Sequence, residues 1–139
     1  MSDSKPKSLW LERTGKGSYV GYSSEGPSVR IGHGEGEFTP GDLLKLALAG
    51  CNATSSDARF SAALGDDYQA SIGVGSQYDQ DTNRFTHMDV EIVTDLSDLS
   101  DQERERLEQR ATAAIDRHCT VGHTLTNGMT TRVVISSEF

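Results

Sequence analysis

Short stretches of alternating apolar and polar residues open the chain, a pattern typical of β-strands. Glycine-containing triplets, Gly15-Lys16-Gly17 and Glu25-Gly26-Pro27, separate these stretches and favour turns. The pattern therefore predicts a hairpin or three-stranded meander before residue 32. The three predicted strands cover residues 8–14, 18–24 and 28–31.

An apolar run that begins at residue 40 predicts the first helix. Thr39 is suited to cap it, Pro40 suits its first position, and Asp42 completes a capping box three residues after Thr39. We expect this helix to end near Leu64. Apolar and small residues recur along one stripe at helical spacing, which predicts a buried central helix. The stripe consists of Leu44, Leu48, Cys51, Ser55, Ala58 and Ala62.

Strict alternation returns in the second half of the chain. It covers residues 68–78 and 88–92, with a polar turn over residues 79–84, and predicts a hairpin with one solvated face. Ser100 and Glu103 then form a second capping box ahead of an amphipathic helix. The apolar face of this helix carries Leu107, Ala111, Ala114, Ile115 and His118.

The last part of the chain reads as a turn-rich segment after Cys119, followed by a closing strand over residues 129–139. The predicted order is thus βββ-α-ββ-α-β. Strands grouped around helices, instead of alternating with them one by one, indicate the α+β class.

Composition narrows the kind of protein. A chain of 139 residues fits a single domain over residues 1–139. Its net charge of −8 repels phosphate backbones, so we expect no nucleic-acid partner. With no secretion signal and no stretch of about 20 apolar residues, we expect no membrane association and a cytoplasmic location. The hydrophobic fraction of 35% is low for a monomer and favours burial against a second subunit.

The candidate chemistry lies in the two cysteines, Cys51 and Cys119. If their side chains meet, the site is a redox dithiol; a permanent structural disulfide is the weaker interpretation in a reducing compartment. Cys51 lies about 18 Å along its helix from Thr39, beyond the reach of that helix dipole, so its thiolate needs a cation from elsewhere, and Arg30 is the candidate. Cys119 can begin a short helix, where amide groups would favour its thiolate.

Other interpretations of the same residues stay open at this point. Free cysteines are most often small buried hydrophobic residues. A zinc site can be drawn from His118, Cys119 and His123 with Cys51, but zinc ligands usually come in close pairs such as CxxC, so we expect no metal and no cofactor. A Cys-His acyl-transfer site lacks an orienting third residue.

Two motifs resemble those of the OsmC-like family, which includes osmotically inducible protein C and the organic hydroperoxide resistance proteins. The segment TPGDLLKLALAGCNATS resembles the central-helix signature, in which a cysteine follows a leading proline by eleven residues, and Pro40 and Cys51 keep this interval. The segment CTVGHTL resembles the second motif, Cys-Pro-Val-Ser followed by Thr-Leu, with Thr120 and Gly122 at the proline and serine positions.

The chain departs from the family pattern directly after the leading proline, where Gly41 stands in place of the usual glutamate. In the family, that glutamate pairs with an arginine that precedes the leading proline, and Arg30 is its counterpart in this sequence. The remaining acidic candidates for a partner of Arg30 are Asp42, Glu35 and Glu37. The chain thus resembles a divergent member of the family.

The resemblance implies antiparallel sheets around two central helices in an intertwined homodimer. It also implies a thiol-dependent peroxidase of oxidative or osmotic stress defence, in which Cys51 is the peroxidatic thiol, Cys119 the resolving thiol, and Arg30 holds the thiolate and polarises the peroxide. Its partners would be an organic hydroperoxide and a dithiol reductant such as a lipoylated protein. The alternative is a non-catalytic stress protein that binds a small hydrophobic ligand at the dimer interface.

Overall fold

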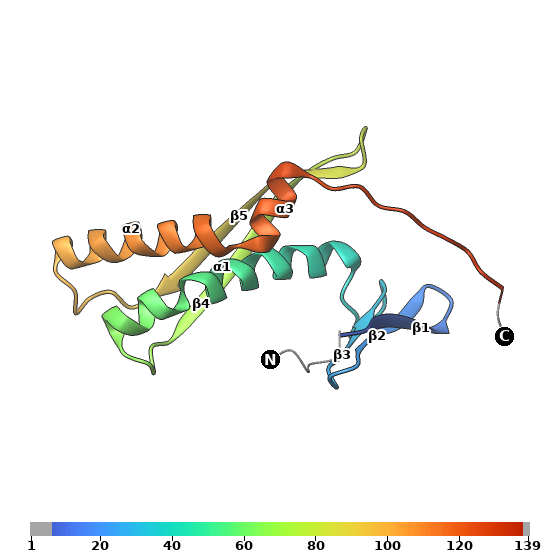
Figure 1. The fold of residues 1–139 in the computed structure, drawn as a ribbon, viewed down its shortest axis with the longest axis horizontal. Coiled ribbons are helices and arrows are strands. Elements are labelled where there is room, and N and C mark those ends of the chain that lie inside the picture. The colour runs from blue at the N-terminus through green and yellow to red at the C-terminus, as the bar shows by residue number, and fades with distance from the viewer. Residues whose placement is uncertain (1–6, 138–139) are drawn as a thin grey trace. The chain divides into compact units, whose positions relative to one another are not determined.

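The structure is a computed structural model that describes residues 7–137 (Figure 1). It divides into two compact units, residues 1–46 and 47–139, whose positions relative to each other are not determined. The elements in chain order are β1 (Leu9–Gly15), β2 (Ser18–Ser23), β3 (Ser28–Ile31), α1 (Pro40–Leu64), β4 (Ala70–Asp79), β5 (Arg84–Thr94), α2 (Asp101–His118) and α3 (Thr120–Asn127).

The first unit contains the predicted meander, an antiparallel sheet in the order β1-β2-β3. Trp10 pairs with Tyr22 across β1 and β2, and Val20 pairs with Arg30 across β2 and β3. Gly17 turns the chain between the first two strands at a φ of 72°, a backbone conformation that residues other than glycine rarely adopt. The strand prediction for this part of the chain is confirmed.

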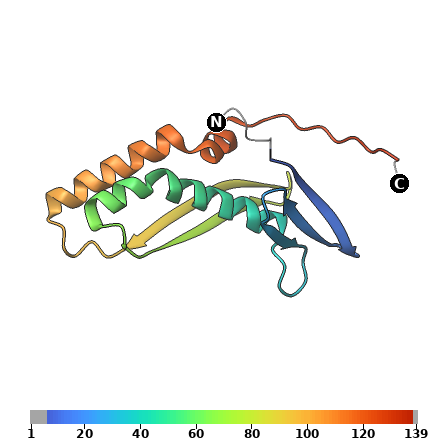
Figure 2. The same ribbon diagram turned by 60° about the horizontal axis from the view of Figure 1, so that its bottom comes forward.

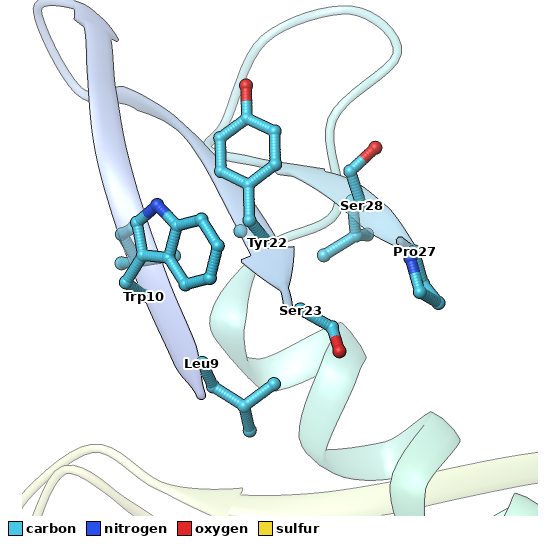
Figure 3. A pocket seen from close by; sticks show the side chains of 9 residues that line it. Leu9, Trp10, Tyr22, Ser23, Pro27 and Ser28 are labelled. Carbon is cyan, nitrogen blue, oxygen red and sulfur yellow. The ribbon is translucent and has the colours of Figure 1, made fainter. Parts of the chain in front are cut away.

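One face of this sheet carries exposed apolar side chains (Figure 3). The rings of Trp10 and Tyr22 stack with their centroids 5.7 Å apart, and Leu9 is 73% exposed. These side chains and Pro27 line a shallow hollow of about 410 Å³. A contiguous apolar patch of this kind usually marks an interaction surface in a soluble protein.

The first helix begins where the sequence predicts. The hydroxyl of Thr39 accepts the Asp42 N–H at 3.0 Å, and the Asp42 carboxylate accepts the Thr39 N–H at 3.0 Å. This reciprocal pair satisfies two backbone donors at the start of α1. Asp42 is therefore a capping residue.

The second unit is built on the β4–β5 hairpin, and α1 and α2 lie side by side along it in both views (Figures 1 and 2). Phe60 of α1 packs with Leu107 and Ala111 of α2 to form the buried core, and its ring stacks on Tyr68. The Ser100–Glu103 capping box begins α2 as predicted. Leu64, Ile92, Leu96 and Leu99 complete the surroundings of the core.

The buried face of α1 differs from the predicted stripe. The structure buries Ala49, Ser56 and Phe60, whereas Leu44 of the predicted stripe is 38% exposed. Small residues occur on every side of this helix, so spacing alone does not select one face. Phe60 has the largest side chain of the helix, and burying it against α2 sets the rotation. Within one chain, Ala58 and Ala62 of the stripe stay exposed, while Cys51 and Ser55 are half-buried.

The end of the chain also departs from the prediction. Residues 120–127 form a helix, and residues 128–137 belong to neither a helix nor a strand, so the predicted closing strand is absent from the described part of the chain. A strand requires a neighbour for its backbone hydrogen bonds, and none of the described strands pairs with this segment. Val133 and Ile135 are 87% and 94% exposed. The α+β class is confirmed, and the order over the described residues is βββ-α-ββ-α-α. Residues 138–139 of the predicted strand lie outside the described residues.

Within residues 7–137, the structure contains no helix that combines the length and the apolar character needed to span a membrane.

Candidate functional site

Cys119 lies at the corner between α2 and α3 and caps both helices. Its backbone N–H donates to the carbonyl of Ile115 at 2.9 Å, which ends α2. Its sulfur accepts the Gly122 N–H at 3.3 Å, which begins α3. A β-carbon on Gly122 would stand 3.1 Å from this sulfur, so the absence of a side chain there permits the close approach. The corner aims the first amide groups of α3 toward α1.

The sulfur of Cys51, on α1, accepts hydrogen bonds from those amide groups. The backbone N–H of Val121 makes the largest contribution and lowers the pKa of the Cys51 thiol; hydrogen bonds from Cys119, Ser55 and the Thr120 N–H act in the same direction and outweigh partial burial. Unsatisfied N–H groups at a helix start are a ready anion site, and such placement is a common way to activate a cysteine. Cys51 is half-buried, which leaves part of the thiol accessible.

Cys119 has the opposite character. It is only 2% exposed, and this burial, followed by its hydrogen bond to Cys51, raises the pKa of the Cys119 thiol. Its S–H also has an acceptor on α1, because the Cys119 sulfur lies 3.2 Å from the side-chain oxygen of Asn52. The site therefore pairs an accessible thiol that ionises readily with a buried thiol that keeps its proton.

These contacts bring the two cysteines together, and both are unbridged thiols. They also revise the sequence argument about their activation. The start of α3 stabilises a thiolate on Cys51, whereas the sequence assigned that benefit to Cys119. The reason is tertiary: the amides at the start of α3 reach both sulfurs, but burial and the hydrogen bond to Cys51 outweigh them at Cys119, whereas they prevail at the less buried Cys51.

The sequence analysis did not assign Asn52 or Ser55 to the site, although it placed Ser55 on the same stripe as Cys51. Ser55 lies one helical turn after Cys51, so its position on the same face was visible in the spacing. Asn52 directly follows Cys51 and had no such signal, because its role depends on where Cys119 arrives.

Comparisons with known proteins show the family of this chain. The family model described as OsmC-like protein matches residues 32–134. The chain belongs to the OsmC-like family. An uncharacterized protein of Mycobacterium bovis is 42% identical to it over 129 residues, which cover 91% of this chain and 94% of that protein.

Solved structures show the OsmC-like fold at low sequence identity. A hypothetical protein from Aquifex aeolicus superposes with a TM-score of 0.70 at 14% identity, over 89% of each chain. An OsmC-like protein from Mycoplasma pneumoniae superposes with a TM-score of 0.59 at 14% identity, over 91% of this chain and 89% of that one. These likenesses support the fold and carry no assignment of activity.

Arg30 of this OsmC-like chain lies on β3, in the first unit, whereas both thiols lie in the second. Its approach to Cys51 therefore stays a prediction. The Arg30 charge acts on Glu37: the Gly34 N–H, bonded at 2.8 Å, is the main cause that lowers the pKa of Glu37, and Arg30 contributes. Asp42 is occupied by its cap, and Glu35 is exposed.

No group of three or more histidine, cysteine or acidic side chains in the described part of the chain is arranged to hold a metal ion. The ring of His123, one of the ligands of the zinc interpretation, instead bonds to the carbonyl of Asp116 at 2.6 Å.

Proposed function

We propose that this protein reduces organic hydroperoxides with Cys51 as the attacking thiol and Cys119 as the resolving thiol, as part of a response to oxidative or osmotic stress. The observation that carries the proposal is the division of the dithiol: Cys51 faces the amide groups at the start of α3, while the buried Cys119 retains its proton within hydrogen-bonding distance of Cys51. Membership of the OsmC-like family supports the same assignment.

In the first step the Cys51 thiolate attacks one oxygen of the hydroperoxide. An S–O bond forms, the O–O bond breaks, and the departing alkoxide takes up a proton to leave as an alcohol. Cys51 becomes a sulfenic acid, oxidised by two electrons. The amide groups of Thr120 and Val121 favour this step because they stabilise the thiolate that performs it.

In the second step the sulfur of Cys119 attacks the sulfur of the sulfenic acid. An S–S bond forms, the S–O bond breaks, and the proton of Cys119 leaves with the hydroxide as water. A dithiol reductant then returns both cysteines to thiols by thiol–disulfide exchange and is itself oxidised to a disulfide. Cys119 needs no solvent access in either step, since its partner is already beside it.

The proposed assembly is a homodimer. Two surfaces of the described residues carry exposed apolar side chains: the β1–β3 face around Trp10 and Tyr22 in the first unit, and the segment with Val133 and Ile135 in the second. A second copy can cover the sheet face and supply an edge on which the segment pairs. Replacing Ile135 with Asp should then shift the protein from dimer to monomer in sedimentation equilibrium, and a wild-type monomer would contradict the assembly.

Mass spectrometry tests the proposed reaction directly. Reduced protein treated with cumene hydroperoxide should lose the mass of two hydrogen atoms and yield a peptide that joins Cys51 to Cys119. Unchanged thiols after treatment would sink the proposal. Steady-state turnover with a lipoyl dithiol and with a monothiol should favour the dithiol, because release of the Cys51–Cys119 bond needs two successive attacks.

The alternative, a non-catalytic binder of a small hydrophobic ligand, draws on the apolar hollow of the first unit (Figure 3). The replacement of Cys51 by Ser separates the two functions. A binder keeps its ligand affinity in this variant, whereas a peroxidase loses its turnover.

A further inference from the structure

The hydrogen of the Cys119 thiol has two competing acceptors. One is the side-chain oxygen of Asn52, 3.2 Å from the Cys119 sulfur, and the other is the sulfur of Cys51. A thiol carries a single proton and can satisfy only one of them at a time. Asn52 therefore competes with Cys51 for the same hydrogen.

We propose that Asn52 is a positioning residue that holds Cys119 in its protonated form and so slows closure of the Cys51–Cys119 disulfide. The inference rests on the proposed dithiol chemistry. It concerns the second step, whereas the start of α3 governs the first.

Two features of the site support this role. The amide oxygen of Asn52 accepts the hydrogen and so stabilises the thiol, because a thiolate has no hydrogen to give. The backbone groups that contact the same sulfur, the N–H of Gly122 at 3.3 Å and that of Val121, favour the thiolate instead. Since Cys119 is nearly inaccessible to water, Asn52 is a side-chain acceptor that solvent cannot easily replace.

Two neighbouring residues of α1 therefore act on different steps: Cys51 performs the first, and Asn52 slows the second. Cys51 can ionise beside α3 without a second thiolate forming next to it. After Cys51 is oxidised, closure waits for Cys119 to lose its proton, so the sulfenic acid lives longer than geometry alone would allow.

Few titratable groups of the second unit act on Cys119, so the pH dependence of disulfide closure can be interpreted. Cys51, from α1, is the titratable group that acts on it. The ring of His123 on α3 is engaged by the carbonyl of Asp116, and the exposed Arg117 and His118 end α2. A shift in the pH dependence of closure caused by a change at Asn52 can then be assigned to Cys119.

The test uses two substitutions with opposite expected signs. Asn52→Leu keeps a similar volume but removes the acceptor, which should speed closure about fivefold, the equivalent of one hydrogen bond of ~1 kcal/mol, and move its pH dependence to lower pH. Asn52→Asp keeps an acceptor and adds a negative charge, which should slow closure and move its pH dependence to higher pH. Thr54→Leu is the matched control, because Thr54 lies on the exposed side of α1 and its hydroxyl bonds to Gly50.

Closure can be measured without peroxide. One equivalent of dithiobis-nitrobenzoate reacts with Cys51 and releases a first coloured thiolate; attack of Cys119 on that mixed disulfide then releases a second as the internal disulfide forms. The second phase reports closure alone. An unchanged or slower second phase in Asn52→Leu overturns the inference, as does slowing in both variants, which would indicate a merely structural role.

The same design separates this inference from the proposed function. If peroxide fails to oxidise the wild-type protein while the two Asn52 variants shift closure in opposite directions, the peroxidase proposal fails and the role of Asn52 stands. If peroxide oxidises the protein and the variants leave closure unchanged, the peroxidase proposal stands and the role of Asn52 fails.

Discussion

Cys51 and Cys119 lie within hydrogen-bonding reach of each other, yet their surroundings shift the pKa values of the two thiols in opposite directions. Amide groups from the start of α3 surround one, and burial dominates the other. A dithiol divided in this way has a defined order of events, since the thiolate reacts first and the protonated partner second.

Replacing Cys119 with Ser should interrupt the reaction after its first step. Cys51 keeps its amide donors from Val121 and Thr120, so the sulfenic acid still forms, but no sulfur is present to close the disulfide. Trapping with dimedone should give one adduct on Cys51 in this variant and little in the wild-type protein. An equal adduct yield in both proteins would mean that Cys119 is not the resolving thiol.

Thr120→Pro should make Cys51 less acidic while preserving α3. Proline is well tolerated at the first position of a helix, and it removes one of the N–H groups that lower the pKa of Cys51. The pH profile of Cys51 alkylation should move to higher pH, so that less thiolate is present at neutral pH. Thr120→Ala, which keeps the N–H, is the control and should leave the profile in place.

The lowered pKa of Cys51 also links ionisation to folding. Because the folded-state pKa lies below that of an ordinary thiol, the anion stabilises the native protein at pH values above the unfolded pKa. This contribution is lost as the pH falls through the folded-state pKa. Cys51→Ser should therefore flatten the rise in the free energy of unfolding with pH on the alkaline side, as measured by urea titration. An unchanged pH slope would contradict the assignment.

Ser55→Ala should slow the attack of Cys51 on peroxide. The Ser55 hydroxyl donates to the Cys51 sulfur from one turn further along α1, and loss of a hydrogen bond of ~1 kcal/mol corresponds to about fivefold in rate. Stopped-flow measurement of thiol loss would give the rate. Thr54→Ala is the control, since its hydroxyl donates to the main-chain carbonyls of Gly50 and Cys51 and not to the thiol; a similar slowing there would point to a general effect on the helix.

Phe60→Ala should destabilise the second unit strongly. Phe60 is 8% exposed and packs on Tyr68 and Leu107, and truncation of a buried Phe typically costs about 3–5 kcal/mol. Urea unfolding followed by circular dichroism would give the change. Arg59→Ala, the exposed neighbour on the same helix, should stay within about 0.5 kcal/mol of wild type.

Local signals account for most of what the sequence predicted. The two capping boxes, at Thr39 and Ser100, lie where helices begin because a cap depends on residues three positions apart. The strand pairs follow from alternation and intervening turns, which are likewise local. The meeting of Cys51 with Cys119 was expected only as a condition of the proposed chemistry and through the family resemblance.

The sequence allowed a short helix to begin at Cys119, but its extent was not predicted, because the α3 segment contains Gly122 and several threonines, which are poor helix formers. Local contacts support this helix, namely the Cys119 cap and bonds such as Thr124 to the Thr120 carbonyl. The other features that escaped prediction depend on distant contacts. The rotation of α1 depends on where Phe60 finds its partners. A final strand after Gly128 would need a neighbouring strand to pair with, and no strand of residues 7–137 pairs with this segment.

The double use of Cys119 as a cap has a mechanical consequence. The sulfur that would join Cys51 also receives the Gly122 N–H at the first turn of α3. When that sulfur turns toward Cys51, the first turn loses its anchor, so oxidation of a side chain is transmitted to the main chain. Amide hydrogen exchange at residues 120–123 should then be faster in the oxidised protein than in the reduced one, and α3 would present a different surface to a reductant in each redox state.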